Sequence, residues 1–166
     1  MKARNYRSIR GMLYTRIEYV HGAPQPKITI FDMGNPKADY DVEIVLRAKE
    51  RALIRDNALE SLRINVNKQL EKRIGPNNYH FSIVVQPYHV IRENKMMTGA
   101  GADRLQEGMR RAFGKPIGRA AAVDVGQPIA VVRTFDQFAS IAKEVLERNK
   151  VRIPKSGYVE VKRLKA

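Results

Sequence analysis

The chain has 166 residues, 43% of them hydrophobic, so it can bury the core of one domain and is not a disordered basic tail. Thirty-one Lys and Arg residues against seventeen Asp and Glu give a net charge of +14, a balance typical of proteins that bind nucleic acid or an anionic membrane. No apolar run approaches the roughly 20 residues that span a bilayer, and most basic segments lack a helical pattern, so nucleic acid is the favoured partner.

Residues 1–26 form a basic arm in which Arg and Tyr recur together. Arginine can bind phosphate through its planar fork, and tyrosine offers a flat face to an unstacked base. We therefore predict that the arm binds RNA, with a solvated and poorly ordered terminus as the alternative. The predicted RNA-binding residues of the arm are Arg4, Tyr6, Arg7, Arg10, Tyr14 and Arg16.

After the arm, the pattern predicts two strands and a helix. The strands are 27–32, which stops at the Gly-Asn-Pro turn signal 34–36, and 42–46. Apolar residues at helical intervals then predict a helix over 58–74. Asn57 followed by Glu60 has the spacing of a capping box at the start of this helix, and Gly75-Pro76 ends it.

The second half of the chain predicts more strands and a second helix. Thr134 followed by Gln137 has capping-box spacing, and a helix runs from there to about Asn149. The chain ends in a basic tail, and the predicted RNA-binding residues of this tail are Lys162, Arg163 and Lys165. The predicted strands of this half are 80–86, 89–92, 120–125, 129–133 and 158–161.

Residues 94–118 separate two of these strands and form the most informative segment of the sequence. They are dense in glycine and basic residues, and their apolar residues follow no sustained strand or helix period. Because loops longer than about 12–15 residues are uncommon within one domain, we expect this basic loop to be functional. The residues predicted to contact RNA in or beside the loop are Arg92, Lys95, Met96, Met97, Arg104, Arg110, Arg111, Phe113, Lys115 and Arg119.

Nothing in the sequence predicts catalysis, a metal site, a cofactor or a small-molecule substrate. The three histidines do not cluster with carboxylates at metal-ligand spacing, and the chain has no cysteine, which also fits a cytoplasmic protein. Gly108 and Gly114 are one residue too far apart for a phosphate-binding loop, and Lys115 is followed by Pro116 rather than Ser or Thr.

Strands outnumber helices and several connections look like hairpins, so we predict one α+β domain over 1–166 with a largely antiparallel or mixed sheet and two main helices. The segment 100–106, followed by 108–110 and 112–116, resembles the signature of a large-subunit ribosomal protein family. The bacterial members of this family are called L-sixteen, and the archaeal and eukaryotic members are called L-ten-e. Segments 14–16, 31–35 and 87–92 support the resemblance, which spans nearly the whole chain and looks archaeal.

The resemblance implies a hammerhead-type α+β fold bound to large-subunit ribosomal RNA in the cytoplasm, beside neighbouring ribosomal proteins. It also implies that the arm threads between RNA helices and that the loop lies near the tRNA acceptor arm at the peptidyl transferase centre. The expected function is structural, with no enzymatic activity. The alternative is a free-standing RNA chaperone or RNA-modification accessory protein.

Overall fold

Two antiparallel sheets and two main helices form the fold, which confirms the predicted α+β class. The structure, a computed structural model, describes residues 6–97, 99, 108–110 and 112–164. The helices are α1 (Asp56–Arg73) and α3 (Ala139–Asn149), and the short 3-10 turns are η2 (Ile17–Tyr19), η3 (Asp136–Phe138) and η4 (Lys150–Arg152). The strands are β1 (Asp32–Gly34), β2 (Val42–Ala48), β3 (Ala52–Arg55), β4 (Tyr79–Ile83), β5 (His89–Glu93), β6 (Lys115–Val123), β7 (Pro128–Thr134) and β8 (Gly157–Arg163).

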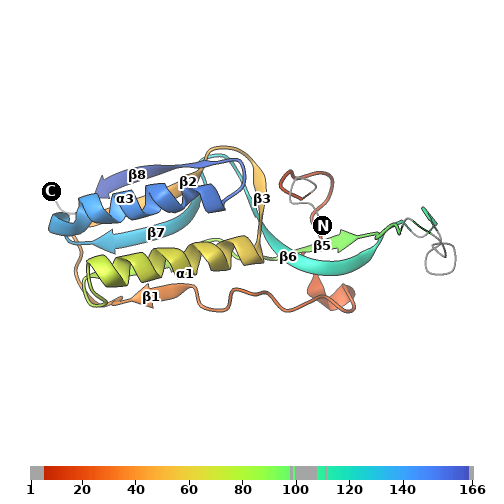
Figure 1. Ribbon diagram of the computed structural model, residues 1–166, viewed down its shortest axis with the longest axis horizontal. Coiled ribbons are helices and arrows are strands. Elements are labelled where there is room, and N and C mark those ends of the chain that lie inside the picture. The colour runs from red at the N-terminus through yellow and green to blue at the C-terminus, as the bar shows by residue number, and fades with distance from the viewer. Residues whose placement is uncertain (1–5, 98, 100–107, 111, 165–166) are drawn as a thin grey trace.

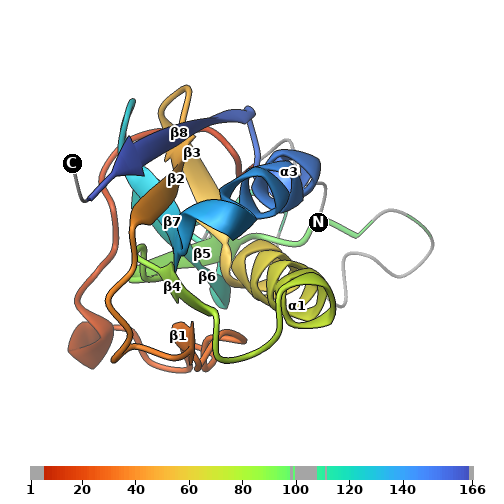
Figure 2. The same cartoon turned by 90° about the vertical axis from the view of Figure 1, so that its left-hand side faces the viewer.

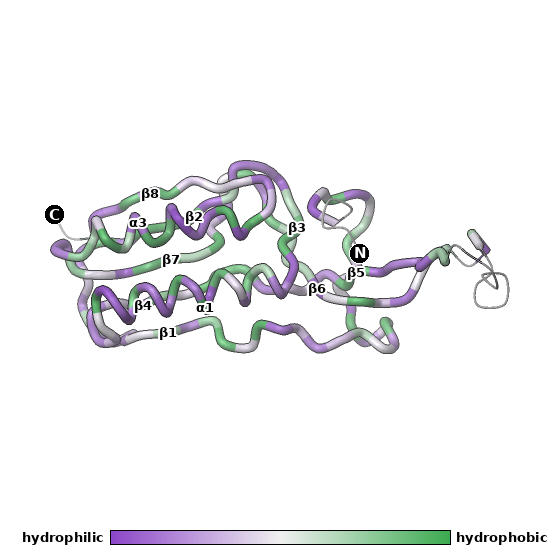
Figure 3. The backbone as a smooth tube through the Cα atoms, viewed as in Figure 1, coloured by the Kyte–Doolittle hydropathy of each residue, from purple (hydrophilic) through white to green (hydrophobic). Residues whose placement is uncertain are grey.

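The larger sheet has the strand order β1-β4-β7-β2-β8, and α1 and α3 lie side by side on one of its faces (Figure 2). Leu59, Leu62, Val66 and Leu70 are fully buried along α1, because residues three and four apart share one face of a helix. Hydrophobic and hydrophilic stretches accordingly alternate along both helices (Figure 3). This packing makes the main core.

The smaller sheet has the order β3-β6-β5 and extends away from the helices (Figure 1). One face of β3 and β6 joins the main core through residues such as Ile54 and Val123, while Leu53 and Ala120 face the opposite way and form a second apolar cluster. The segment between β5 and β6 therefore leaves the molecule at the end farthest from the C-terminus (Figure 1).

Both predicted capping boxes are wrong. The residue before α1 is Arg55, and the neighbouring Asp56 accepts hydrogen bonds from the backbone N–H groups of Asn57 (2.8 Å) and Lys27 (3.0 Å). Thr134 ends β7, and its hydroxyl donates to the carbonyl oxygen of Asn78 (3.0 Å), so it caps no helix.

Three strand predictions also need correction. Most of the predicted strand 27–32 has no strand partner, and β1 pairs with β4 only over Asp32–Gly34. The short strand β3 was not predicted. The predicted loop ends earlier than Gly118, because Lys115 pairs with Glu93 as the first residue of β6.

Candidate nucleic-acid interface

The described part of the N-terminal arm is docked across the small sheet. The N–H of Leu53, on edge strand β3, donates to the carbonyl oxygen of Arg7 (3.0 Å), and the N–H of Val90, on edge strand β5, donates to that of Tyr14 (2.9 Å). Between these two bonds, apolar arm side chains pack on the second cluster. The arm thus shields both sheet edges, which would otherwise expose unpaired backbone groups.

The arm continues around the small sheet, so that η2 lies on the other side of it from the first arm residues (Figure 1). Tyr6 belongs to the docked part of the arm, and its RNA contact stays a prediction. Burial, followed by the nearby Glu93 carboxylate and a hydrogen bond to it, raises the pKa of the Tyr6 phenol. Tyr6 therefore helps to hold the arm in place through its contact with Glu93.

Five residues join the arm to the ends of β5 and β6, and we call them the anchor cluster: Tyr14, His89, Arg92, Phe113 and Gly114. The Tyr14 ring stacks on His89, with centroids 6.1 Å apart, and meets the Phe113 ring edge-on at 5.5 Å. The Arg92 guanidinium lies 4.2 Å from the centre of the Phe113 ring. Its Nε and a terminal nitrogen donate to the Gly114 carbonyl oxygen at 3.1 and 2.7 Å.

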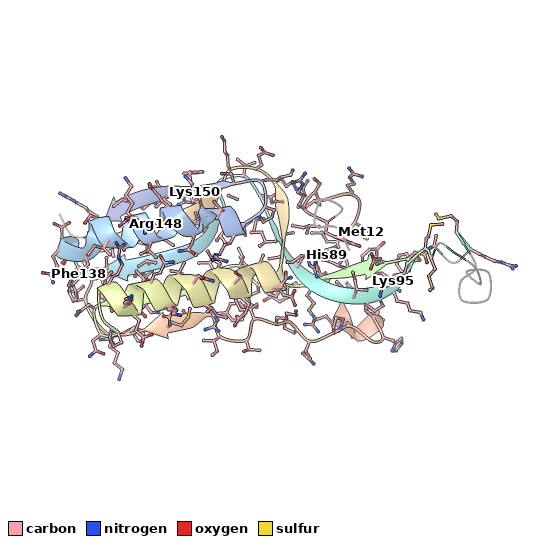
Figure 4. The ribbon with its side chains drawn as sticks, viewed as in Figure 1. Met12, His89, Lys95, Phe138, Arg148 and Lys150 are labelled. Atoms are coloured by element: carbon pink, nitrogen blue, oxygen red, sulfur yellow. The ribbon has the colours of Figure 1, made fainter. Side chains whose placement is uncertain are left out.

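Arg92 thus makes structural contacts at the base of the loop, and its RNA contact stays a prediction. We call residues 94–114, which join β5 to β6, the connecting segment. The contacts of the Arg92 guanidinium with the Phe113 ring and the Gly114 carbonyl hold the two ends of this segment together. Met12 and His89 lie where the arm meets β5, and Lys95 lies farther out toward the connecting segment (Figure 4).

Burial lowers the pKa of His89, so its ring is neutral near neutral pH. The neutral ring fits the geometry, because the Tyr14 N–H donates to Nδ1 of His89 over 3.0 Å and a proton on that nitrogen would remove the acceptor. Protonation of His89 would therefore remove this contact between the arm and β5.

The backbone conformation and surroundings of position 114 require a glycine. Its φ is +81°, and a Cβ at this position would lie 2.5 Å from the carbonyl carbon of Glu93. Only glycine accommodates both conditions without strain, since L-residues rarely adopt that φ and the contact is with backbone. The connecting segment consequently returns to β6 in close contact with the end of β5.

Ion pairing divides the arginines into two groups. Six arginines on the large sheet, the helices and the turn before β3 have a carboxylate partner: Arg47, Arg51, Arg63, Arg73, Arg133 and Arg148. Within the described residues, no carboxylate lies within ion-pair distance of those on or beside the arm and the small sheet: Arg7, Arg10, Arg16, Arg55, Arg92, Arg119 and Arg152. Most of the described arginines without a carboxylate partner therefore lie on or beside the arm and the small sheet, while Arg163, at the end of β8, also lacks one.

Most predicted loop residues that the structure describes are exposed on the connecting segment: Lys95, Met96, Met97, Arg110 and Phe113. Lys115 and Arg119 lie in β6 instead, and the Nε of Arg119 is buried without a hydrogen-bond partner in the described structure. The predicted residues Arg4, Arg104, Arg111 and Lys165 lie outside the described residues.

The tail does not join the arm and the connecting segment. Lys162 and Arg163 are exposed at the end of β8, and the described C-terminal end lies at the opposite end of the molecule (Figure 1). Lys162 also faces Glu160 at 3.9 Å. Sequence reasoning missed Arg55 and Arg152, because only the tertiary structure shows that they lack carboxylate partners.

The described part of the chain has neither a membrane-spanning helix nor a cluster of metal-binding side chains. No helix there is long and apolar enough to cross a membrane. No group of three His, Cys, Asp or Glu side chains there could hold a metal ion.

Comparison with known proteins decides the family. The sequence profile described as ribosomal protein L16p/L10e matches residues 9–158. The chain belongs to this family. It is similar to the archaeal proteins named large ribosomal subunit protein uL16. That of Hyperthermus butylicus is 50% identical over 162 residues, covering 98% of this chain and 90% of that protein. That of Staphylothermus marinus is 49% identical over 163 residues, covering 98% and 94%.

A third relative, uL16 of Archaeoglobus fulgidus, is 48% identical over 141 residues, covering 85% of this chain and 81% of that protein. The resemblance predicted from the sequence, including its archaeal character, is confirmed. As an L16p/L10e family member the chain is a structural component of the large ribosomal subunit and not an enzyme. Its partners in that particle are ribosomal RNA and other ribosomal proteins.

Proposed function

We propose that the arm and the small sheet bind large-subunit ribosomal RNA, while the connecting segment helps to position the acceptor arm of tRNA near the peptidyl transferase centre. The observation that carries this proposal is the division of the arginines. Arginines that already face a carboxylate gain little from a phosphate, whereas an unpaired one can neutralise it and release counterions. Arg92 lies at the base of the connecting segment, and Arg7, Arg10 and Arg16 lie on the arm that docks on the same small sheet.

The anchor cluster supports a positioning role for the connecting segment. Arg92, Phe113 and Gly114 hold its two ends together, and Tyr14 ties those ends to the arm. RNA that binds the arm therefore also fixes the direction in which the segment leaves the small sheet. Beyond the anchor cluster, Met109 is 69% exposed and Lys95 and Arg110 are exposed, so apolar and cationic groups are available to a partner.

The tail residues Lys162 and Arg163 remain a prediction of a second RNA contact, separate from the first. Their place at the opposite end of the molecule suits a different RNA segment. In this arrangement the protein would bridge two regions of RNA. The chemistry of peptide transfer itself would need no side chain of this protein.

The positioning role is tested by deleting residues 99–111, which spares the whole anchor cluster. Large subunits that lack the protein are reconstituted with the full chain, with the deletion variant, or with a variant in which a Gly-Ser linker of equal length replaces 99–111. We expect all three to co-sediment with the subunit at moderate salt, and both variants to bind tRNA more weakly than the full chain. Normal tRNA binding by the deletion variant would refute the role of the segment.

A further inference from the structure

A cavity of about 290 Å³ opens on the side of the arm away from the anchor cluster. It lies between the arm, β3, the first turn of α1 and η4. Its wall is apolar where Leu53, Ala58, Ile153 and Pro154 contribute, and the Tyr6 ring adds to it. The volume is near the lower end of the range for small-molecule sites, ~300–1,000 Å³, which suits one planar ring system better than a larger group.

Three arginines line the same cavity: Arg7, Arg55 and Arg152. None of them has a carboxylate within ion-pair distance in the described structure. The Nε of Arg55 is buried and has no hydrogen-bond partner among the described residues.

The cationic side of the cavity is held in place before any ligand arrives. Arg152 donates from Nε to the side-chain oxygen of Asn149 (3.1 Å) and from a terminal nitrogen to Ser61 Oγ (2.7 Å). The backbone of Arg7 is held at the edge of β3, because its carbonyl oxygen accepts from the N–H of Leu53. The neighbouring acid, Asp56, is buried and accepts two backbone N–H groups, and it makes no ion pair with these arginines in the described structure.

We propose that this cavity receives one unpaired nucleotide of ribosomal RNA, with its base against the apolar wall and its phosphates on the arginines. The inference rests on the proposed function, since it names one contact of the RNA-binding surface. Unstacked bases are bound by proteins on aromatic rings and guanidinium planes, and phosphates by unpaired arginines, and this cavity combines both. A peptide of a neighbouring protein would leave the three positive charges unneutralised unless it were acidic.

The test fills the cavity without removing a charge. Asn57 is exposed and lines the cavity, so Asn57→Trp places a large ring in it. The control is Asn77→Trp, an exposed asparagine in the turn after the opposite end of α1. Both full-length variants are reconstituted into large subunits, and the reactivity of each ribosomal RNA nucleotide toward a 2′-hydroxyl reagent is compared with that of the parent.

We expect Asn57→Trp to incorporate and to raise the reactivity of one nucleotide about fivefold or more, the low end of what loss of one stacked base produces. Asn77→Trp should change none. An incorporated Asn57→Trp variant that alters no nucleotide would overturn the cavity proposal. A parent chain that protects no nucleotide anywhere would instead show that the proposed RNA-binding function is wrong.

A second measurement does not depend on how the tryptophan is tolerated. Val151 lines the cavity and is 81% exposed, so a photoreactive amino acid can replace it at little cost to the fold. Irradiation of the reconstituted subunit should cross-link this position to one ribosomal RNA nucleotide, the same one that Asn57→Trp exposes. A cross-link to a protein instead would contradict the proposal.

Discussion

Removing the guanidinium of Arg92 should loosen the base of the connecting segment without unfolding the protein. Arg92→Met keeps the aliphatic stem and removes the contacts with Phe113 and the Gly114 carbonyl. A cation over a half-exposed ring contributes ~0.5–1 kcal/mol, and a charged donor to one carbonyl ~1.5–3 kcal/mol. Because the methionine sulfur regains part of the ring contact, we expect a net local loss of roughly 1.5–2 kcal/mol.

Amide hydrogen exchange of the free protein measures this loss where it occurs. A loss of that size corresponds to a fall in protection of roughly ten- to thirtyfold for the amides that pair the ends of β5 and β6. Strands of the large sheet should keep their protection. The control is Arg73→Met, which removes an ion pair between two side chains that are each about 40% exposed (39% and 41%), and exposed pairs of this kind contribute little to stability. Unchanged protection at Glu93 and Lys115 in Arg92→Met would refute the structural role of Arg92.

Two further predictions concern the anchor cluster. Since burial lowers the pKa of His89 in the folded state, the unfolded chain takes up this proton first. The stability that the neutral ring contributes should thus be present above about pH 6.5 and decrease as the pH falls below it, until the folded ring is also protonated. Urea unfolding at several pH values should show this decrease in the parent and in His21→Gln but not in His89→Phe, and an identical pH profile for His89→Phe would contradict it. Gly114→Ala should cost more than the ~1–2 kcal/mol of a left-handed residue alone, because the added carbon also meets the Glu93 backbone. Its effect should appear as lost exchange protection at the ends of β5 and β6, and protection equal to that of the parent would show the reasoning to be wrong.

The periodicity of apolar residues in the sequence predicted those helices and strands that have one buried and one exposed face. The alternation in β4 and the apolar stripe of α1 arise because one face of each lies in the core, so the sequence alone carries that signal. The capping boxes failed for a different reason. Asp56 and Asn57 are adjacent potential caps, and the partners of Asp56 and Thr134, namely Lys27 and Asn78, are distant in sequence.

The candidate site was predictable in composition but not in arrangement. The density of Arg, Tyr and Gly marked the arm and the connecting segment as RNA-binding candidates. Only the fold brings Tyr14, His89 and Phe113 together, because their contacts join parts of the chain 75 and more residues apart. The same holds for the arginines: whether one meets a carboxylate is decided by strand register, as for Arg133 and Glu43 on paired strands.

The salt dependence of RNA binding tests most directly whether the unpaired arginines are the RNA-binding surface. Two triple variants of the full chain remove the same charge: Arg7, Arg10 and Arg16 to Gln on the arm, and Arg73, Arg133 and Arg148 to Gln on the ion-paired body. Each phosphate contact contributes ~0.7–0.9 to the slope of log affinity against log salt. We expect the arm variant to reduce the slope for large-subunit RNA by about 2 to 3 and the body variant to leave it nearly unchanged. Equal reductions in the two variants would show that RNA binding follows net charge alone and would contradict the account.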